Sequence, residues 1–283
     1  KGEGVLIGTD FLKYVNEGKS TGIGKRVLVI GGGNVALDCA RVALRLGADE
    51  VRLACVEAQD KMPAAQDEID EGRSEGIVFF YSRTCTRIIR ESGMVTGAEF
   101  SKVRSFTFDE DGNIEIETIE DSAHVIETDT IIFAVGQKPE VPAAPGLNTT
   151  PHGLIESDPY TFETSISSVF AAGDAATRSS SVIGAISSGR KAAIAIDKFL
   201  EGNGNIEQKL APSFELKCYL GPDKTFAALN RCNEKHWYPD KRIHGFTEIA
   251  ERLDEQSAQH ESERCLQCDL RLTIKPVKLW VNY

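Results

Sequence analysis

The sequence predicts an α/β fold that contains a parallel sheet, followed by a smaller second module and a polar C-terminal tail. Three observations support this prediction. A strand, a glycine turn, an amphipathic helix and a second strand follow one another within residues 26–57. Short alternating segments over 84–128 indicate an antiparallel β-meander. An amphipathic helix over 182–200 then belongs to a different module.

The first structural unit begins with a β-branched run. "RVLVI" (26–30) lies close to glycines and predicts a buried strand, and "NVALDCARVALRL" (34–46) has apolar residues at helical spacing before Gly47. "EVRLACVE" (50–57) predicts the next strand. This βαβ order favours parallel strands with a right-handed crossover. Residues before the first strand contain a short apolar piece and a helical turn at "DFLKYV".

The following elements complete this domain. "DEIDEGRSEG" (67–76) predicts a short solvated helix, and "IVFFY" predicts a strand. In the meander, "VRSFTF" and "NIEIETI" flank "DEDGN", which contains an Asp-Gly turn. "TDTIIFAVG" (128–136) predicts a strand that ends on a glycine.

The second module follows the Pro-rich "QKPEVPAAPGL". "SSVFAAGDAA" (167–176) predicts a strand that runs into Gly-Asp, and "VIGAISSGRKAAIAIDKFL" (182–200) predicts a helix. From 203 onward the sequence is polar and irregular, with one predicted helix near "TEIAERLDEQSAQHESERC".

Composition excludes several classes of protein. The 283 residues carry a formal net charge of −11, which argues against general binding to nucleic acid or to an anionic membrane. No window reaches the roughly 18 apolar residues of a membrane span, and the first residues show no charged-then-apolar pattern of a signal peptide. Seven cysteines, an odd number, favour a reducing cytoplasm over a disulfide scaffold. Cys39, Cys55 and Cys85 lie in apolar segments, and we expect them to be buried.

The turn after the first strand carries the clearest chemistry. Gly31-Gly32-Gly33-Asn34-Val35-Ala36 fits G-x-G-x-x-G/A between a strand and a helix. Gly31 permits a tight turn, Gly33 lets the backbone approach a pyrophosphate, and Ala36 allows close packing of helix on strand. The helix N-terminus presents free N–H groups to the phosphates. The motif therefore predicts a dinucleotide site, in which Asn34 either caps the helix or contacts the ligand.

Glu57 follows the glycines by about 20 residues and is expected at the end of the second strand. An acidic side chain there accepts hydrogen bonds from the adenine ribose hydroxyls and repels a 2′-phosphate. The alternative is a solvated glutamate at a strand end. Arg52 and Lys61 are nearby basic residues that oppose the first interpretation.

Three segments together resemble the glutamate synthase small-subunit family of flavin-dependent NAD(P)H oxidoreductases. These are "VLVIGGGNVALDCARVALRLGADEV…MPA", "DTIIFAVGQKP" and "VFAAGDAA…VIGAISSGRKAAIAIDKFL", and "GVLIGTDFL" resembles the segment that leads into the nicotinamide domain. The resemblance implies a two-dinucleotide-binding-domain flavoprotein fold like that of disulfide reductases. A nicotinamide domain with its β-meander is then inserted in a partial FAD domain.

The resemblance divides the chain into four parts. They are a connector to the FAD domain (1–20), an NAD(P)-binding domain (21–135), the C-terminal part of an FAD-binding domain (136–202) and a tail (203–283). The family's opening FAD-binding βαβ is not among these residues, so we expect this chain alone to bind flavin weakly and to be inactive. The family's second strand often ends in Tyr-Arg-Arg, whereas this sequence has Cys55-Val56-Glu57, which favours NAD(H) over NADP(H).

The resemblance also assigns residues to the flavin site of the full-length protein. Asp174, beside Gly173, is expected to accept from a ribityl hydroxyl, and Gly136 to bring the backbone close to the cofactor. The helix that starts at Val182 and Ile183 is expected to direct its N–H groups at the isoalloxazine ring. Hydride transfer from nicotinamide to flavin needs no side-chain acid, and we identify no catalytic residue.

The tail contains Cys265-x-x-Cys268, which is compatible with half of an iron–sulfur or zinc site, a redox dithiol or two structural cysteines. Cys218 and Cys232 are candidates for the remaining ligands, although their spacing is not diagnostic. The five histidines form no metal-binding pair.

The sequence leaves three functional hypotheses. The first is an oxidoreductase that takes hydride from NADH to FAD and passes electrons to an iron–sulfur partner or subunit. The second is a non-catalytic NAD-binding regulatory or assembly module, and the third is an NADH-dependent disulfide reductase that uses Cys265 and Cys268. Each is compatible with an oligomer, and none involves nucleic acid or a membrane span.

Overall fold

The chain folds into two compact units in the computed structural model, one formed by residues 1–135 and 218–283 and the other by residues 136–217. The structure describes residues 3–108, 114–137, 139–141, 144–177, 181–206, 228–233 and 235–264.

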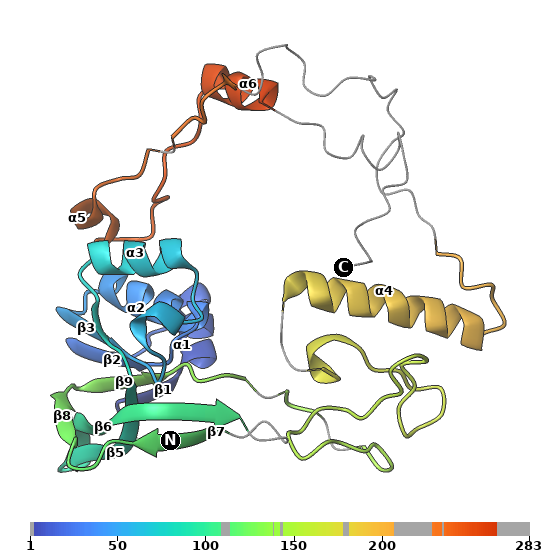
Figure 1. Ribbon diagram of the computed structural model, residues 1–283, viewed down its shortest axis with the longest axis horizontal. Helices are drawn as coiled ribbons and strands as arrows, with labels where there is room; N and C mark the ends of the chain where they lie inside the picture. Colours follow the sequence, from blue (N-terminus) through green and yellow to red (C-terminus); the bar gives the residue numbers. More distant parts are fainter. Residues whose placement is uncertain are drawn as a thin grey trace. The chain divides into compact units, whose positions relative to one another are not determined.

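A five-stranded, all-parallel sheet forms the centre of the first unit (Figure 1). Its order is β1-β9-β2-β3-β4. The strands are β1 (Val5–Ile7), β2 (Arg26–Ile30), β3 (Glu50–Ala54), β4 (Val78–Phe80) and β9 (Thr130–Phe133). The predicted parallel sheet is therefore confirmed. The sheet also includes β1, which lies in the segment expected to be a connector and pairs with β9.

Three helices cover one face of this sheet, as Figure 1 shows. They are α1 (Gly8–Asn16), α2 (Asn34–Arg45) and α3 (Gln66–Ser74), and a short 3-10 helix, η1 (Gln59–Lys61), precedes α3. The apolar face of α2 packs Leu37, Cys39 and Ala40, all 0% exposed, against the strands. This packing is the consequence of the helical spacing in the sequence.

The predicted β-meander covers the other face of the sheet. Its strands are β5 (Arg83–Glu91), β6 (Met94–Phe108), β7 (Ile114–Thr118) and β8 (His124–Glu127), and β6 pairs antiparallel with the other three. Phe100 and Ile126 of this layer pack against Leu28 and Ile131 of the parallel sheet. The predicted turn at 109–113 lies outside the described residues.

The second unit contains the 18-residue helix α4 (Val182–Phe199) and a 3-10 turn, η2 (Gly173–Ala175). The predicted helix over 182–200 is confirmed, but the predicted strand over 167–176 is wrong. Phe170 makes one isolated bridge with Glu163, and no ladder extends it among the described residues. Within the described part of this unit, the buried apolar side chains are Ala171 and Ala192. A short apolar run with so little to pack against does not form a regular strand.

The described C-terminal residues form two short helices, α5 (Pro239–Arg242) and α6 (Glu255–Glu263). The predicted tail helix corresponds to α6, whose N-terminus is capped by Asp254 through a 2.7 Å hydrogen bond from Ser257 N–H. The described residues contain no helix long and apolar enough to cross a membrane.

Candidate functional site

The glycine turn joins β2 to α2 at the carboxyl edge of the parallel sheet. Gly31 has φ +146°, and a Cβ on it would lie 2.3 Å from the Ala134 carbonyl oxygen. Gly31 N–H donates to Ala54 O (2.9 Å), and Ala134 N–H donates to Ile30 O (2.8 Å). Only glycine fits where the ends of β2, β3 and β9 approach so closely.

Gly33 differs from Gly31 because the space beside it is open. It is the N-cap residue of α2 at φ −90° and ψ 175°, and a Cβ added there would meet no heavy atom within 4 Å. Ala36, one turn into the helix, is fully buried, and Val35 is half-buried. The first N–H groups of α2 have no intrahelical partner, so this opening faces free donors and the positive end of the helix dipole. Open space at a helix N-terminus is where proteins commonly bind anions.

Glu57 brings a carboxylate to the same turn. It lies three residues beyond the end of β3, so the predicted strand to residue 57 is too long. A Cβ on Gly32 would come within 2.5 Å of Glu57 Oε2, which shows that the carboxylate lies directly over Gly32. The Glu57 main chain is fixed by Ser82 N–H, which donates to Glu57 O at 2.8 Å. The structure thus brings Gly31, Gly33 and Glu57 together.

The neighbouring basic residues do not neutralise this carboxylate through any contact that the structure shows. Arg52 donates from Nη1 to Glu127 O and from Nη2 to Glu50 Oε2, both at 2.5 Å. Lys61 is exposed at the end of η1. Arg52 is therefore engaged elsewhere on the sheet.

The Cys55 thiol also borders Glu57 and is 2% exposed. Burial, followed by the charge of Glu57, raises the pKa of this thiol to about 12. The thiol remains protonated near neutral pH and is a structural group, not a nucleophile.

Sequence reasoning missed the part played by residues 64 and 65. Ala64 N–H donates to Gly32 O (3.2 Å), and Ala65 N–H donates to Asn34 Oδ1 (2.8 Å). The Asn34 side chain thus holds the segment before α3 against the glycine turn and does not cap α2. The "MPA" at 62–64 was a usable indication, because it is a short apolar run after the polar "QDK", and Met62 and Ala64 are both buried in the apolar core.

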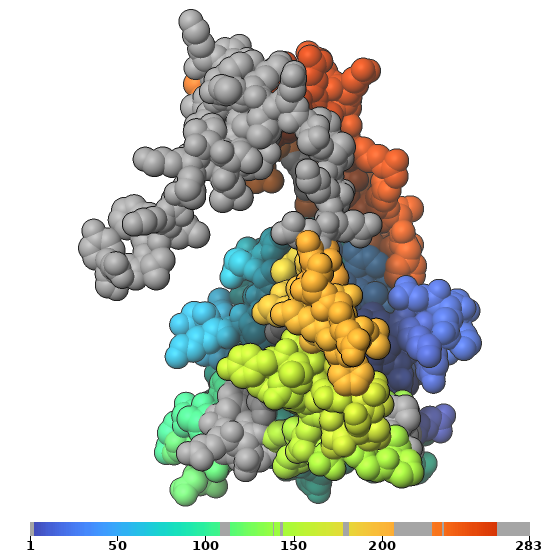
Figure 2. Space-filling view, turned by 90° about the vertical axis from the view of Figure 1, so that its right-hand side faces the viewer, coloured from blue at the N-terminus to red at the C-terminus, as the bar shows by residue number. Residues whose placement is uncertain are grey.

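The remaining predicted cofactor residues belong to the second unit, whose surface is shown in Figure 2. Asp174 is exposed in η2, and Gly173 N–H donates to Ser188 Oγ of α4 (3.0 Å). Ser181 caps α4 by accepting from Gly184 N–H, and Val182 and Ile183 are 76% and 74% exposed. The acid and the apolar helix N-terminus are therefore accessible to a ligand.

Gly136, at the start of this unit, has φ +109°, and a Cβ there would meet nothing within 4 Å. Its backbone is thus open on one side, as the close approach of a cofactor requires.

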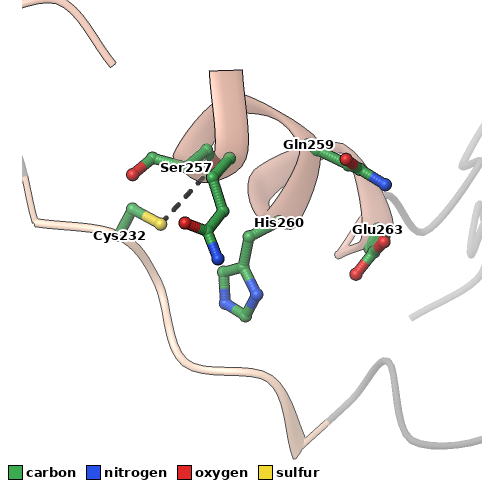
Figure 3. Close-up of a pocket in the computed structure, with 6 residues that line it drawn as sticks. Cys232, Ser257, Gln259, His260 and Glu263 are labelled. Carbon is green, nitrogen blue, oxygen red and sulfur yellow. Dashed lines mark hydrogen bonds between the residues drawn. The ribbon is translucent and has the colours of Figure 1, made fainter. Parts of the chain in front are cut away.

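Of the four candidate cysteine ligands, the structure describes Cys232, whereas Cys218, Cys265 and Cys268 lie outside the described residues. Cys232 lines a hollow of about 430 Å³ beside α6 (Figure 3). Its Sγ donates to Ser257 O (3.7 Å), and its N–H donates to Glu261 Oε1. The described part of the chain contains no group of three metal-ligating side chains.

The fold and the turn define a dinucleotide-binding α/β protein with a second, flavin-type module. Residues 2–189 match the model of the pyridine nucleotide-disulphide oxidoreductase family. The chain belongs to this family, which confirms the predicted fold class and the resemblance drawn from the three motifs.

Three relatives refine the comparison. The chain is 29% identical over 273 residues to the NADP(+)-dependent formate dehydrogenase subunit beta of Moorella thermoacetica, covering 94% of this chain and 39% of the relative. It is 30% identical over 306 residues to the NADPH-Fe(3+) oxidoreductase subunit beta of Geobacter sulfurreducens, covering 92% and 44%. It is 34% identical over 185 residues to the glutamate synthase [NADPH] small chain of Escherichia coli, covering 63% and 39%. The chain thus spans about two fifths of the length of these relatives.

The coverage separates the relatives into two kinds. Residues 1–202 make up less than three quarters of the chain, so the matches over 94% and 92% extend well into the 203–283 segment. The Escherichia coli match covers 63%. Most of the 203–283 segment is therefore matched in the formate dehydrogenase and NADPH-Fe(3+) oxidoreductase subunits.

Proposed function

We propose that this chain is part of a cytoplasmic oxidoreductase that transfers hydride from NADH to FAD and passes electrons to an iron–sulfur partner or subunit. The observation that carries the proposal is the glycine turn, where open space beside Gly33 adjoins the Glu57 carboxylate over Gly32. Family membership supports the reaction class, and the two relatives that share the tail are named as subunits.

In this proposal the turn holds NADH by its pyrophosphate and its adenine ribose. The N–H groups at the start of α2 donate to the pyrophosphate, which enters at Gly33 because nothing lies within 4 Å of a Cβ there. The Glu57 carboxylate accepts hydrogen bonds from the ribose hydroxyls. The buried Ala36 allows α2 to lie close to the sheet, so the donors reach the ligand.

The second unit fits the C-terminal half of a flavin site. FAD, when bound, supplies a two-electron acceptor that can release electrons singly. Asp174 is placed to accept from a ligand hydroxyl, and the N–H groups at the start of α4 lie beside the exposed Val182 and Ile183. An exposed apolar surface next to the N–H groups of a helix N-terminus suits the isoalloxazine ring, because this ring is flat and gains negative charge on reduction. Gly136 contributes an open backbone position.

The preference for NADH over NADPH follows from charge. A 2′-phosphate at the ribose would meet the Glu57 carboxylate, while Arg52 is bonded to Glu127 O and Glu50. The relatives are named for NADP(+) or NADPH. At about 30% identity the few side chains around the ribose can differ, and Glu57 is the difference that we propose to matter here.

The cofactor preference is tested by Glu57→Arg, with Glu115→Arg as a control. Glu115 lies exposed on β7 of the antiparallel sheet, so the control makes the same change in net charge away from the turn. Titration with each nucleotide should show the NADPH to NADH affinity ratio rising by about tenfold or more in Glu57→Arg and staying constant in the control. Tighter NADPH binding by the unsubstituted chain would refute the NADH preference but keep the dinucleotide site.

The proposal also includes the route by which electrons leave the flavin. The tail shared with two relatives carries Cys265-x-x-Cys268, and we propose these thiolates, with Cys218 and Cys232, as candidate cluster ligands. The test is NADH-dependent dye reduction by the full-length, flavin-loaded protein. No dye reduction would favour the non-catalytic module. Loss of all output on blocking Cys265 and Cys268, together with disulfide reduction, would favour the disulfide reductase.

A further inference from the structure

Three guanidinium groups and three carboxylates meet where α2, α3 and α5 pack together. They belong to Arg41, Arg45, Arg242, Glu68, Glu71 and Glu75. The side chain of Glu75 is 0% exposed and those of Arg41 and Arg45 are 10% and 8% exposed. The cluster therefore lies largely out of solvent, and the six formal charges cancel.

Most of these pairs join α2 to the C-terminal turn of α3. Arg45 donates to Glu75 through both Nη1 and Nη2, at 2.9 and 3.0 Å. Arg41 donates to Glu75 (2.9 and 3.1 Å), to Glu71 (2.6 Å) and to Glu68 (2.6 Å). Two guanidiniums thus face three carboxylates within the nicotinamide-binding domain, which leaves one negative charge in excess.

Arg242 supplies the third cation from the C-terminal segment. Its side chain is 5% exposed, and Nη2 donates to Ser74 Oγ at 2.9 Å. Nη1 lies 3.7 Å from Glu71 Oε2, and Nε lies 3.6 Å from Glu75 Oε1. Nε and Nη1 make no hydrogen bond to the described residues. A buried guanidinium with two unsatisfied donors depends on the charge of Glu71 and Glu75 for its stability.

The segment that carries Arg242 is a closed loop. Trp237 N–H donates to Ile249 O (2.9 Å) and Glu251 N–H donates to Lys235 O (2.7 Å), which closes residues 235–251 at the base. His236 Nδ1 lies 3.2 Å from Glu71 Oε1. The loop therefore meets α3 at both its base and Arg242.

We propose that the face of α3 formed by Glu71, Ser74 and Glu75 is a docking surface for the C-terminal part of this same chain, and that Arg242 anchors it. The occupant is the 235–251 loop. Charge complementarity supports this choice, since the loop brings the Arg242 guanidinium to two of the carboxylates of the cluster, Glu71 and Glu75. Exposed ion pairs of the same segment, such as Arg252 with Glu248, contribute little because water screens them.

Docking at this face links the C-terminal segment to the dinucleotide turn. α3 begins directly after Ala65, whose N–H donates to Asn34 Oδ1 (2.8 Å), and ends beside Arg242. The same nine-residue helix is thus held at one end by the glycine turn and at the other by the docked loop. That link matters for electron transfer only if the proposed function holds, whereas the docking itself does not depend on it.

The test is hydrogen–deuterium exchange on the full chain, with Arg242→Ala compared with Arg252→Ala. Arg252 makes the matched control because it lies in the same segment with an 84% exposed side chain. The amides of Trp237 and Glu251 report on the loop, and those of β2 and β3 report on the domain fold. Arg242→Ala should speed exchange in the loop by about tenfold or more, without changing β2 and β3, and Arg252→Ala should change neither.

Unchanged loop exchange in Arg242→Ala would overturn the proposal. If exchange in β2 and β3 also rises, Ser74→Ala decides the question, because it removes the Arg242 Nη2 hydrogen bond and leaves all six charges in place. A smaller rise confined to the loop then supports the docking surface, and no rise rejects it. No cofactor is needed, so the result is independent of whether NADH binds.

Discussion

Gly33→Ala is expected to weaken dinucleotide binding while leaving the fold intact, whereas Gly31→Ala is expected to destabilise the fold itself. Both variants add one methyl group to the same turn, two residues apart. The structure separates them because a Cβ at Gly33 meets nothing within 4 Å, and a Cβ at Gly31 lies 2.3 Å from Ala134 O. Gly31→Ala therefore serves as the control when Gly33→Ala is used to test whether the turn binds a dinucleotide.

The expected changes in stability follow from the backbone angles of Gly33 and Gly31. Gly33 has φ −90° and ψ 175°, which any residue adopts. Alanine there stabilises by about 0.4–1 kcal/mol through the unfolded chain but is a poorer N-cap than glycine, so the net change is below about 1 kcal/mol. At Gly31, φ +146° adds strain of about 1–3 kcal/mol before the clash with Ala134 O is relieved.

Thermal unfolding followed by circular dichroism and titration with NADH provide the two measurements. Gly33→Ala should unfold within about 2–4 °C of the unsubstituted protein and bind NADH about tenfold more weakly, a loss of about 1.4 kcal/mol. Gly31→Ala should unfold at a clearly lower temperature. Full NADH affinity in a folded Gly33→Ala protein would refute the placement of the pyrophosphate at this turn.

The remaining predictions concern buried ionisable groups. Burial would raise the pKa of Glu75, but hydrogen bonds from Arg45 and Arg41 outweigh it and hold this pKa below its ordinary value. The stability that Glu75 contributes is therefore complete above the unfolded pKa of about 4.3 and is lost as the pH falls through the folded value. Thermal unfolding from pH 7 to pH 3 should show this acid loss, and Glu75→Gln should lower stability at pH 7 by about 3–5 kcal/mol and flatten the profile. Burial also raises the pKa of Cys39 and Cys55 to about 12, so peptide mapping should find both unmodified by a thiol reagent in the native protein and modified after denaturation.

Local patterns predicted the central elements well. The strand at 26–30 and the helix from residue 34 are set by β-branched and helical periodicity, and the structure places both within one residue of the predicted bounds. The strand at Val5–Ile7 was missed because it has three residues and depends on pairing with Ile131–Phe133, more than a hundred residues away. Periodicity in a short window carries no information about such a partner.

The candidate site also contains residues that local sequence patterns predict and residues whose role depends on distant contacts. The glycine turn is a local motif, and Gly31, Gly33 and Ala36 were identified from sequence, whereas the bonds of Ala64 and Ala65 to this turn were not. Spacing predicted an acidic residue at the end of the second strand, but β3 ends at Ala54, and the position of the Glu57 carboxylate over Gly32 is known only from the structure. Arg242 could not be found from sequence, because its role depends on a contact with α3 about 170 residues earlier in the chain.

The hydrogen bonds of Ala64 and Ala65 bear on the proposed cofactor preference, because they fix the backbone near the side chain on which it depends. They fasten the segment after Glu57 to Gly32 O and Asn34 Oδ1, and Ser82 N–H fixes the main chain of Glu57 itself. Residue 57 therefore extends from a backbone that is held on both sides and against the glycine turn. A substitution at residue 57 is therefore expected to change the charge beside the turn without moving the backbone. In the proposed function, the specificity of this site thus depends on the side chain at 57, while the fold of the turn depends on Gly31.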